Sequence, residues 1–201
     1  IYNPKIQIKV ADSTPKAFLL KALDMIRRGN NSIVFVADKT IRTALIKRGL
    51  SEEQARLCNV KGCYEYSVQG GMDTGMNYLN LLKPLEYALH CGCDGVTGKF
   101  VGLQSPSVEK YTTFNDFYEE YKKQLKYVID CAIETVNDYE DYLAYINPQS
   151  MLSATYPSCL EKGKDALEGG ATENGTVLGC GFIADIADSL TAIKKYVFDR
   201  K

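Results

Sequence analysis

The chain has 201 residues, of which 45% are hydrophobic and 24% are charged, and its formal net charge is -1. These values are typical of a globular protein and exclude an intrinsically disordered chain. The nearly balanced charge provides no basic surface for nucleic acid or for an anionic membrane, and no apolar run is long enough to span a bilayer, so we expect neither partner.

Strand and helix patterns alternate along the first 60 residues. Residues 5–10 alternate apolar and polar side chains, as in a half-buried strand. A helix capped by Ser13 or Thr14 follows, and Gly29 ends it. We then expect a strand at 32–36, a helix at 38–47 and a helical turn with a capping pattern at 51–54. Such alternation favours an α/β layout with parallel strands.

Helical periodicity dominates the rest of the chain. We expect helices at 79–90, at 114–147 as one long helix or a helical pair, at 150–162, and from Ala184 onward. Glycine-rich loops are expected at 70–75 and 169–181. The chain begins within a strand pattern and ends within a helical pattern that has no stop signal. We therefore expect an internal piece of a longer protein.

The cysteines indicate a reducing compartment. The chain has seven of them, at positions 58, 63, 91, 93, 131, 159 and 180. An odd number without a signal-like segment does not predict a disulfide framework, so we expect reduced thiols and a cytoplasmic protein. Most of these cysteines lie in apolar stretches, where cysteine packs as a small buried hydrophobic residue.

One short segment combines a thiol with a carboxyl group. Cys63 and Glu65 are separated by one residue, and side chains at positions i and i+2 of an extended segment face the same side. Gly62 precedes the cysteine and permits a tight turn. The thiol can give up a hydrogen atom and become a thiyl radical, while the carboxyl group can take or give a proton. Radical elimination needs both steps at one place.

The same two residues are also compatible with simpler roles. A thiolate nucleophile needs a histidine or another cation to lower its pKa. The only histidine is His90, and nothing in the sequence places it beside Cys63. When Cys-x-Glu stands alone, it most often consists of a structural cysteine followed by a solvated glutamate.

A longer match favours a catalytic role for Cys63 and Glu65 over a structural one. The segment around the cysteine, "VKGCYEYSVQGG", resembles the Gly-Cys-x-Glu loop of glycyl radical eliminases, which belong to the pyruvate formate-lyase-like superfamily. Three flanking segments resemble the same family: "NPKIQIKV", "IRTALIKRGLSEEQAR" and "MNYLNLLKPLEYAL". The block "CLEKGKDALEGGATENGTVLGCGFIADIADSLTAIKKYVF" resembles its Gly-Gly-Ala loop and Ala-Asp-Ser-Leu helix. The match runs in order over nearly the whole chain, which is more specific than any single motif.

The resemblance implies a fold and a reaction. The family fold is a helix-rich, ten-stranded α/β barrel, of which residues 1–201 would form a central fragment, without the N-terminal part and the C-terminal glycyl radical domain. By resemblance, Cys63 is the thiyl-radical residue and Glu65 is the general acid/base. The whole enzyme would be a lyase or dehydratase for a small polar substrate, and we expect the 201 residues alone to be inactive.

Neighbouring residues bear on the branch of the family. Pyruvate formate-lyase proper has two adjacent cysteines, whereas Cys63 is flanked by Gly62 and Tyr64. An eliminase is therefore favoured, with an arylacetate-type radical decarboxylase as the alternative. Tyr66 stands where many eliminases have proline, and Thr74 resembles the threonine of choline lyase. We predict that these two residues bind the substrate.

The resemblance also implies partners. The glycyl radical would lie on a residue outside this chain, and no other cofactor would be bound. A separate activating enzyme, which uses S-adenosylmethionine and an iron–sulfur cluster, would install the radical. The whole enzyme would be an oxygen-sensitive, cytoplasmic homodimer from an anaerobic organism.

Two further motifs would indicate another class of protein, a non-catalytic nucleotide- or metal-binding module. Residues 179–184 fit G-x-G-x-x-A before a helix, as in a dinucleotide-binding turn, although a packing loop that enters a helix fits as well. Residues 90–94 read His-Cys-Gly-Cys-Asp, which contains metal-ligating side chains. No second ligand pair accompanies them, and Gly92 can cap a helix there, so we expect no metal site.

Overall fold

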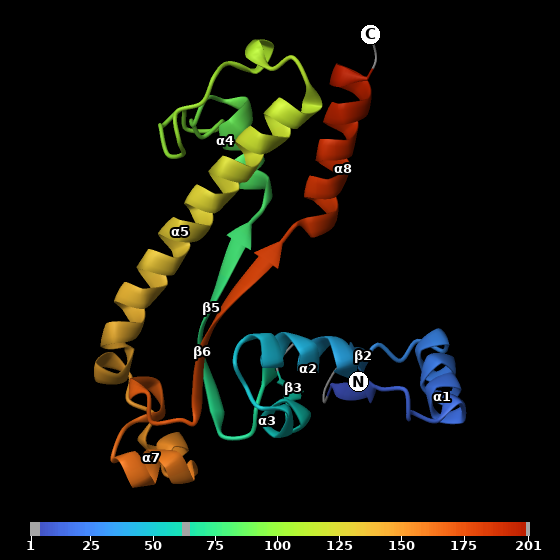
Figure 1. Cartoon of the computed structure of the whole chain (residues 1–201), viewed down its shortest axis with the longest axis vertical. Helices are drawn as coiled ribbons and strands as arrows, with labels where there is room; N and C mark the ends of the chain where they lie inside the picture. Colours follow the sequence, from blue (N-terminus) through green and yellow to red (C-terminus); the bar gives the residue numbers. More distant parts are fainter. Residues whose placement is uncertain (1–4, 62–64, 200–201) are drawn as a thin grey trace.

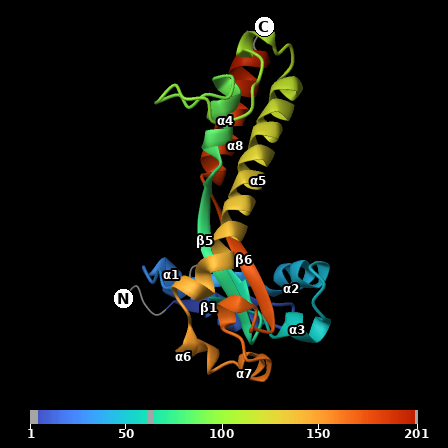
Figure 2. The same cartoon turned by 90° about the vertical axis from the view of Figure 1, so that its left-hand side faces the viewer.

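The structure is a computed structural model that describes residues 5–61 and 65–199. The molecule is elongated, and two long strands, β5 and β6, run through its middle (Figures 1 and 2). Helices α4 and α8 lie at one end of these strands, while α1–α3 and α6–α7 lie at the other. Within the described residues, no helix has both the length and the apolar character needed to cross a membrane.

The N-terminal elements confirm the predicted parallel α/β arrangement. Strand β1 (Ile6–Val10), helix α1 (Lys16–Arg27), strand β2 (Ile33–Ala37) and helix α2 (Asp38–Lys47) follow each other in the chain. The strands pair in parallel from Ile6 with Ile33 to Val10 with Ala37. The predicted cap of α1 is wrong. Pro15 is the N-cap, and the Thr14 hydroxyl instead accepts a hydrogen bond from the Ala11 N–H at 2.9 Å.

A short antiparallel pair carries the predicted carboxyl group. Helix α3 (Glu52–Arg56) begins with the expected capping box, in which Ser51 and Gln54 satisfy each other's backbone N–H groups. Strand β3 (Asn59–Lys61) then pairs with β4 (Glu65–Ser67), with Val60 opposite Tyr66 and Lys61 opposite Glu65. Cys63 lies between these strands in the sequence and outside the described residues.

Two segments that we expected to be glycine-rich loops are the longest strands. Strand β5 (Gly71–Asn80) pairs in parallel with β6 (Glu173–Gly181), and a bulge lies between Thr74 and Met76. The predicted helix at 79–90 begins only at α4 (Leu82–Leu89). The prediction failed because the pairing joins segments about 100 residues apart, and the cross-strand contacts that stabilise a strand are invisible in its local sequence.

The long helical pattern forms one helix. Helix α5 (Phe114–Ile146) has 33 residues, follows the 3-10 turn η1 (Val108–Lys110), and begins with a capping box of Thr113 and Asp116. The predicted helix at 150–162 is instead split into α6 (Ser150–Ser153) and α7 (Pro157–Lys162). Tyr156 is extended there, because the residue before a proline avoids the helical conformation.

The C-terminal helix is close to its expected position. Helix α8 (Ile183–Ile193) starts one residue earlier than predicted and continues into the π-helical turn η3 (Lys194–Phe198). It packs with α4 and α5 in a buried cluster at one end of the long strands. The cluster contains Leu85, Ala88, Phe117, Tyr121 and Ile186.

A buried amide side chain joins α5 to the loop after α4. Gln124 has no exposed surface. Its Nε2 donates to the Leu103 carbonyl at 2.7 Å, and its Oε1 accepts from the Leu103 N–H at 2.9 Å. Gly102 must lack a side chain here, because a Cβ would lie 2.6 Å from that Oε1.

We predict that Gln124→Leu destabilises the protein although it keeps the side-chain volume. Leucine leaves both Leu103 backbone groups without their partner, and an unmade hydrogen bond of this kind costs about 1–3 kcal/mol. Urea unfolding monitored by circular dichroism measures the loss. Asn137→Leu, at an exposed position of the same helix, should change the free energy of unfolding little. Equal stability of the two variants would contradict this role of Gln124.

Candidate active site

Glu65 lines a cleft between the short and the long strands. The cleft has a volume of about 470 Å³. Its walls come from the end of α2, from β4, and from both long strands. The lining residues are Arg48, Glu65, Tyr66, Asp73, Tyr78, Thr176, Val177, Leu178, Gly179 and Cys180. Of the predicted substrate-binding residues, Tyr66 lines the cleft and Thr74 does not.

A small hydrophobic cluster sets the position of β4. Leu45 of α2, Ala55 of α3, Cys58 and Val68 are buried together, and Tyr66 packs against them. Helices α2 and α3 and the strand that carries Glu65 therefore share one core. Cys58 is 2% exposed, so the expectation of a small buried residue is confirmed at this cysteine.

An ammonium group adds polar contacts to this arrangement. Lys9 of β1 donates to the Cys58 carbonyl at 2.9 Å, just before β3 begins. Its Nζ also lies 3.1 Å from a carboxylate oxygen of Asp38. Asp38 lies at the start of α2 and pairs in addition with Arg42 at 3.4 Å. Burial opposes ionisation of Asp38, but the hydrogen bonds and charges of Lys9 and Arg42 outweigh it and lower the pKa of this carboxyl group.

Thr74 faces away from the cleft, toward α5. Its hydroxyl contacts the carboxylate of Glu140 and lies 3.2 Å from the Gly175 carbonyl. The Thr176 hydroxyl donates to the same Glu140 oxygen at 2.6 Å. One carboxylate of α5 thus holds a threonine from each long strand. This arrangement orients the two strands, and it follows from strand alternation that Asp73, one residue before Thr74, lies on the cleft side.

Sequence reasoning missed two polar residues of the cleft, Arg48 and Asp73. Both approach Gly175: a Cβ added there would lie 2.6 Å from Asp73 Oδ1 and 3.4 Å from Arg48 Nη2. No local signal marks these residues, because Arg48 is an exposed residue at the end of a helix and Asp73 lies in a segment that resembles a loop. Only the pairing of β5 with β6 brings Gly175 to them.

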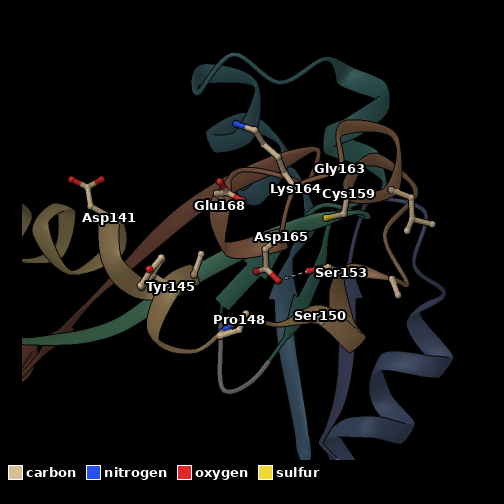
Figure 3. A pocket seen from close by; sticks show the side chains of 13 residues that line it. Asp141, Tyr145, Pro148, Ser150, Ser153, Cys159, Gly163, Lys164, Asp165 and Glu168 are labelled. Atoms are coloured by element: carbon tan, nitrogen blue, oxygen red, sulfur yellow. Dashed lines mark hydrogen bonds between the residues drawn. The ribbon is translucent and has the colours of Figure 1, made fainter.

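Another cavity, of about 600 Å³, lies between the end of α5, α6 and α7 (Figure 3). It shares no lining residue with the cleft. The Asp165 carboxylate points toward Ser153 there and accepts a hydrogen bond from its hydroxyl at 2.9 Å. The backbone N–H groups of Gln149 and Leu167 also donate to Asp165 at 2.9 Å. The Asp165 carboxylate therefore links the start of α6, at Gln149, to the turn at Leu167.

Residues 179–184 and 90–94, the two motifs that would indicate a nucleotide- or metal-binding module, have structural roles. Gly179 and Gly181 are paired within β6, so the loop of free backbone N–H groups that a dinucleotide phosphate requires is not formed there. In the other motif, Asp94 binds Lys83 and the N–H and hydroxyl groups of Thr97. Across residues 5–61 and 65–199, no group of three or more histidine, cysteine, aspartate or glutamate side chains could hold a metal ion.

Comparison with known proteins decides the family. The family model described as pyruvate formate lyase-like matches residues 1–201. The chain belongs to this family. The resemblance that the cysteine loop and its flanking segments predicted is therefore confirmed.

Several dehydratases are similar to this member of the pyruvate formate lyase-like family. Trans-4-hydroxy-L-proline dehydratase of Clostridioides difficile is 33% identical over 204 residues, which cover 100% of this chain and 26% of that protein. A structure solved for 1,2-propanediol dehydration in Roseburia inulinivorans has a TM-score of 0.90 at 33% identity. The B12-independent glycerol dehydratase of Clostridium butyricum has a TM-score of 0.90 at 30% identity. Each alignment with these structures covers 100% of this chain and 25% of the other.

These likenesses confirm the predicted fold class, a mixed helix-and-strand portion of the family's α/β barrel. The chain spans about a quarter of the length of the relatives that it matches.

We predict that Asp38→Asn lowers the free energy of unfolding by about 1–2 kcal/mol at pH 7, because Lys9 and Arg42 lose their charged partner. The pKa of Asp38 is lower in the folded protein than its ordinary value of 3.8. Its stabilising effect is therefore complete above that value and is lost as the pH falls through the folded pKa. Urea unfolding at pH 7 and pH 3 should show the difference between wild type and variant shrinking at the lower pH.

The control for this prediction is Asp12→Asn, which changes an exposed carboxyl group nearby. It should leave the unfolding free energy within about 0.5 kcal/mol at both pH values. A penalty for Asp38→Asn that is equally large at pH 3 would contradict the role of the ionised carboxylate.

Proposed function

We propose that this chain is the central part of a glycyl radical enzyme that performs thiyl-radical elimination on a small polar substrate. One observation carries the proposal: Glu65 of the Cys-x-Glu segment lines a cleft of about 470 Å³. Membership of the pyruvate formate lyase-like family supports it. The similarity to three dehydratases favours dehydration over the arylacetate decarboxylation that the sequence left as an alternative.

The reaction divides between the two predicted residues. A radical supplied from a residue outside this chain would remove the hydrogen atom of the Cys63 thiol. The Cys63 sulfur then takes a hydrogen atom from a substrate carbon, which re-forms the S–H bond and leaves a carbon radical. Glu65 donates a proton to the neighbouring hydroxyl group, which departs as water, and takes up the proton that the substrate radical loses in the same step, so that Glu65 returns to its starting state. Cys63 finally returns a hydrogen atom to the product radical, so the thiol acts as a carrier and is not consumed.

The position of Glu65 suits this role. It is paired with Lys61 of β3, and the next residue, Tyr66, packs on the buried cluster, so the strand has a well-determined position. A positioned acid or base contributes typically about a hundred- to ten-thousand-fold to a rate. A fixed strand two residues beyond the thiol is a suitable support for such a group.

The substrate-binding predictions differ in their support. The Tyr66 side chain lines the cleft, and we propose that it forms one wall of the substrate site. The Thr74 hydroxyl is occupied by Glu140 and by the Gly175 carbonyl. A substrate contact by Thr74 stays a prediction, and it would require the hydroxyl to leave these partners.

The remaining parts of the proposal concern the whole enzyme. We propose that the glycyl radical resides on a part of the protein beyond these 201 residues, and that a radical S-adenosylmethionine enzyme installs it. We propose further that the enzyme is a cytoplasmic homodimer. The family membership and the quarter-length match to the relatives support a radical residue beyond this chain.

Cys63→Ser in the whole enzyme is expected to abolish turnover, because an alcohol O–H bond is much harder to cleave homolytically than a thiol S–H bond. Installation of the glycyl radical should be unaffected, since it occurs elsewhere. Electron paramagnetic resonance measures the radical, and chromatography measures the product. Cys159→Ser, at a buried cysteine outside the cleft, is the control and should retain turnover. Full activity of the Cys63 variant with the radical present would sink the proposed mechanism.

Glu65→Gln is expected to reduce product formation by about a hundred-fold or more, since glutamine keeps the size but cannot give or take the proton. Hydrogen abstraction should persist, so exchange of hydrogen between substrate and enzyme should remain detectable with deuterated substrate. This separates the two variants, because Cys63→Ser should show no exchange. Unchanged product formation by Glu65→Gln would exclude Glu65 as the acid/base.

A further inference from the structure

The cavity between the end of α5, α6 and α7 combines apolar walls with strongly exposed side chains (Figure 3). Its apolar lining residues are Ala144, Tyr145, Pro148, Ala154, Cys159 and Leu160. The Tyr145 side chain is 92% exposed and Leu160 is 66% exposed. Large apolar side chains that remain exposed around a hollow are typical of a surface that another polypeptide segment covers.

Hydrogen bonds give the floor of this cavity a fixed shape. The Ser153 hydroxyl donates to the Asp165 carboxylate and accepts from the Ala166 N–H, each at 2.9 Å. Ser153, Cys159 and Ala166 are buried. A surface of fixed shape loses little conformational entropy when another segment packs on it, so the cavity is preorganised for docking.

The cavity carries an excess of negative charge. Three carboxylates, of Asp141, Asp165 and Glu168, and one ammonium, of Lys164, line it. Asp165 is held by donors of the chain itself, whereas Asp141 and Glu168 are exposed. Asp141 and Tyr145 lie one helical turn apart on α5, so a cation can contact a carboxylate and an aromatic ring together. Charge complementarity therefore favours a basic occupant.

The length of the relatives indicates where the occupant comes from. The chain spans about a quarter of the length of the relatives that it matches. A segment of the same polypeptide is held near the cavity by its covalent connection, at an effective concentration of up to about millimolar for a short flexible linker. Docking within one polypeptide also avoids the cost of bringing two molecules together. These terms favour a segment of the same polypeptide over a separate protein.

We propose that this cavity is the docking site for a segment of the whole protein that lies outside these 201 residues. The segment packs an apolar side chain against Tyr145 and Leu160, and it places a lysine or arginine beside Asp141 and Glu168. The assignment rests on the proposed function only in treating the chain as part of a longer enzyme. It involves neither of the residues that we propose for the chemistry.

Hydroxyl-radical footprinting of the purified whole protein, before a glycyl radical is installed, tests the assignment. It compares the oxidation rate of Tyr145 in the folded protein with the rate in the urea-unfolded protein. A tyrosine that is 92% exposed would react at nearly the same rate in both states. A docked segment should slow the oxidation of Tyr145 by about ten-fold or more, as for a side chain in the dry centre of an interface. This protection should not change when the protein is diluted.

The charge requirement is tested with a double variant, Asp141→Asn with Glu168→Gln. It should raise the oxidation rate of Tyr145 in the folded whole protein by about three-fold or more, because the basic group loses its partners. The matched control is Asp138→Asn with Glu161→Gln, at exposed positions of α5 and α7 that do not line the cavity. Tyr121, which is buried, should stay protected in both variants and so reports that they are folded.

Three outcomes would overturn the assignment. Tyr145 could be oxidised in the folded whole protein as fast as in urea, so that no segment of the same polypeptide covers it. Its protection could fall on dilution, which would place a second copy on the cavity. The double carboxylate variant could protect Tyr145 as well as the wild type does, which would exclude a basic occupant. None of these measurements depends on turnover, so they are distinct from a failure of the Cys63 and Glu65 variants.

Discussion

The parallel pairing of β5 with β6 is the constraint on which the rest of the structure depends. It joins segments about 100 residues apart, from Gly71 with Glu173 to Asn80 with Gly181. Closing so long a loop costs conformational entropy. The ladder of hydrogen bonds along the strands offsets part of that cost, as does the contact of Glu140 with a threonine from each strand. Because both strands then enter helices at the same end, α4 and α8 meet there over α5.

The same pairing creates the cleft. The hydroxyls of Thr74 and Thr176 contact Glu140 of α5, while Asp73, on the face of β5 opposite Thr74, lines the cleft with Glu65 and Arg48. A one-residue shift of register would exchange these faces. The placement of Asp73 beside the proposed acid/base therefore depends on the register of β5 with β6, to which Glu140 of α5 contributes.

The short strand pair has a separate support. Leu45, Ala55, Cys58 and Val68 form a core of their own, and Lys9 binds the Cys58 carbonyl from the first strand. The segment that carries Glu65 is thus anchored by the N-terminal α/β unit, whereas Asp73, on the opposite wall of the cleft, belongs to the long strands. The cleft lies where these two units meet, which is a common place for a ligand site.

The sequence by itself determined the family, the parallel α/β character of the first 60 residues and the single most informative segment, Cys63-x-Glu65. It also predicted the capping box at Ser51 and the long helix from Phe114, because capping and helical periodicity are local properties. Only the tertiary structure showed that 71–80 and 173–181 are strands, and that Arg48 and Asp73 share the cleft with Glu65. These features arise from contacts between residues that are distant in the chain, and such contacts leave no periodic signal in either segment alone.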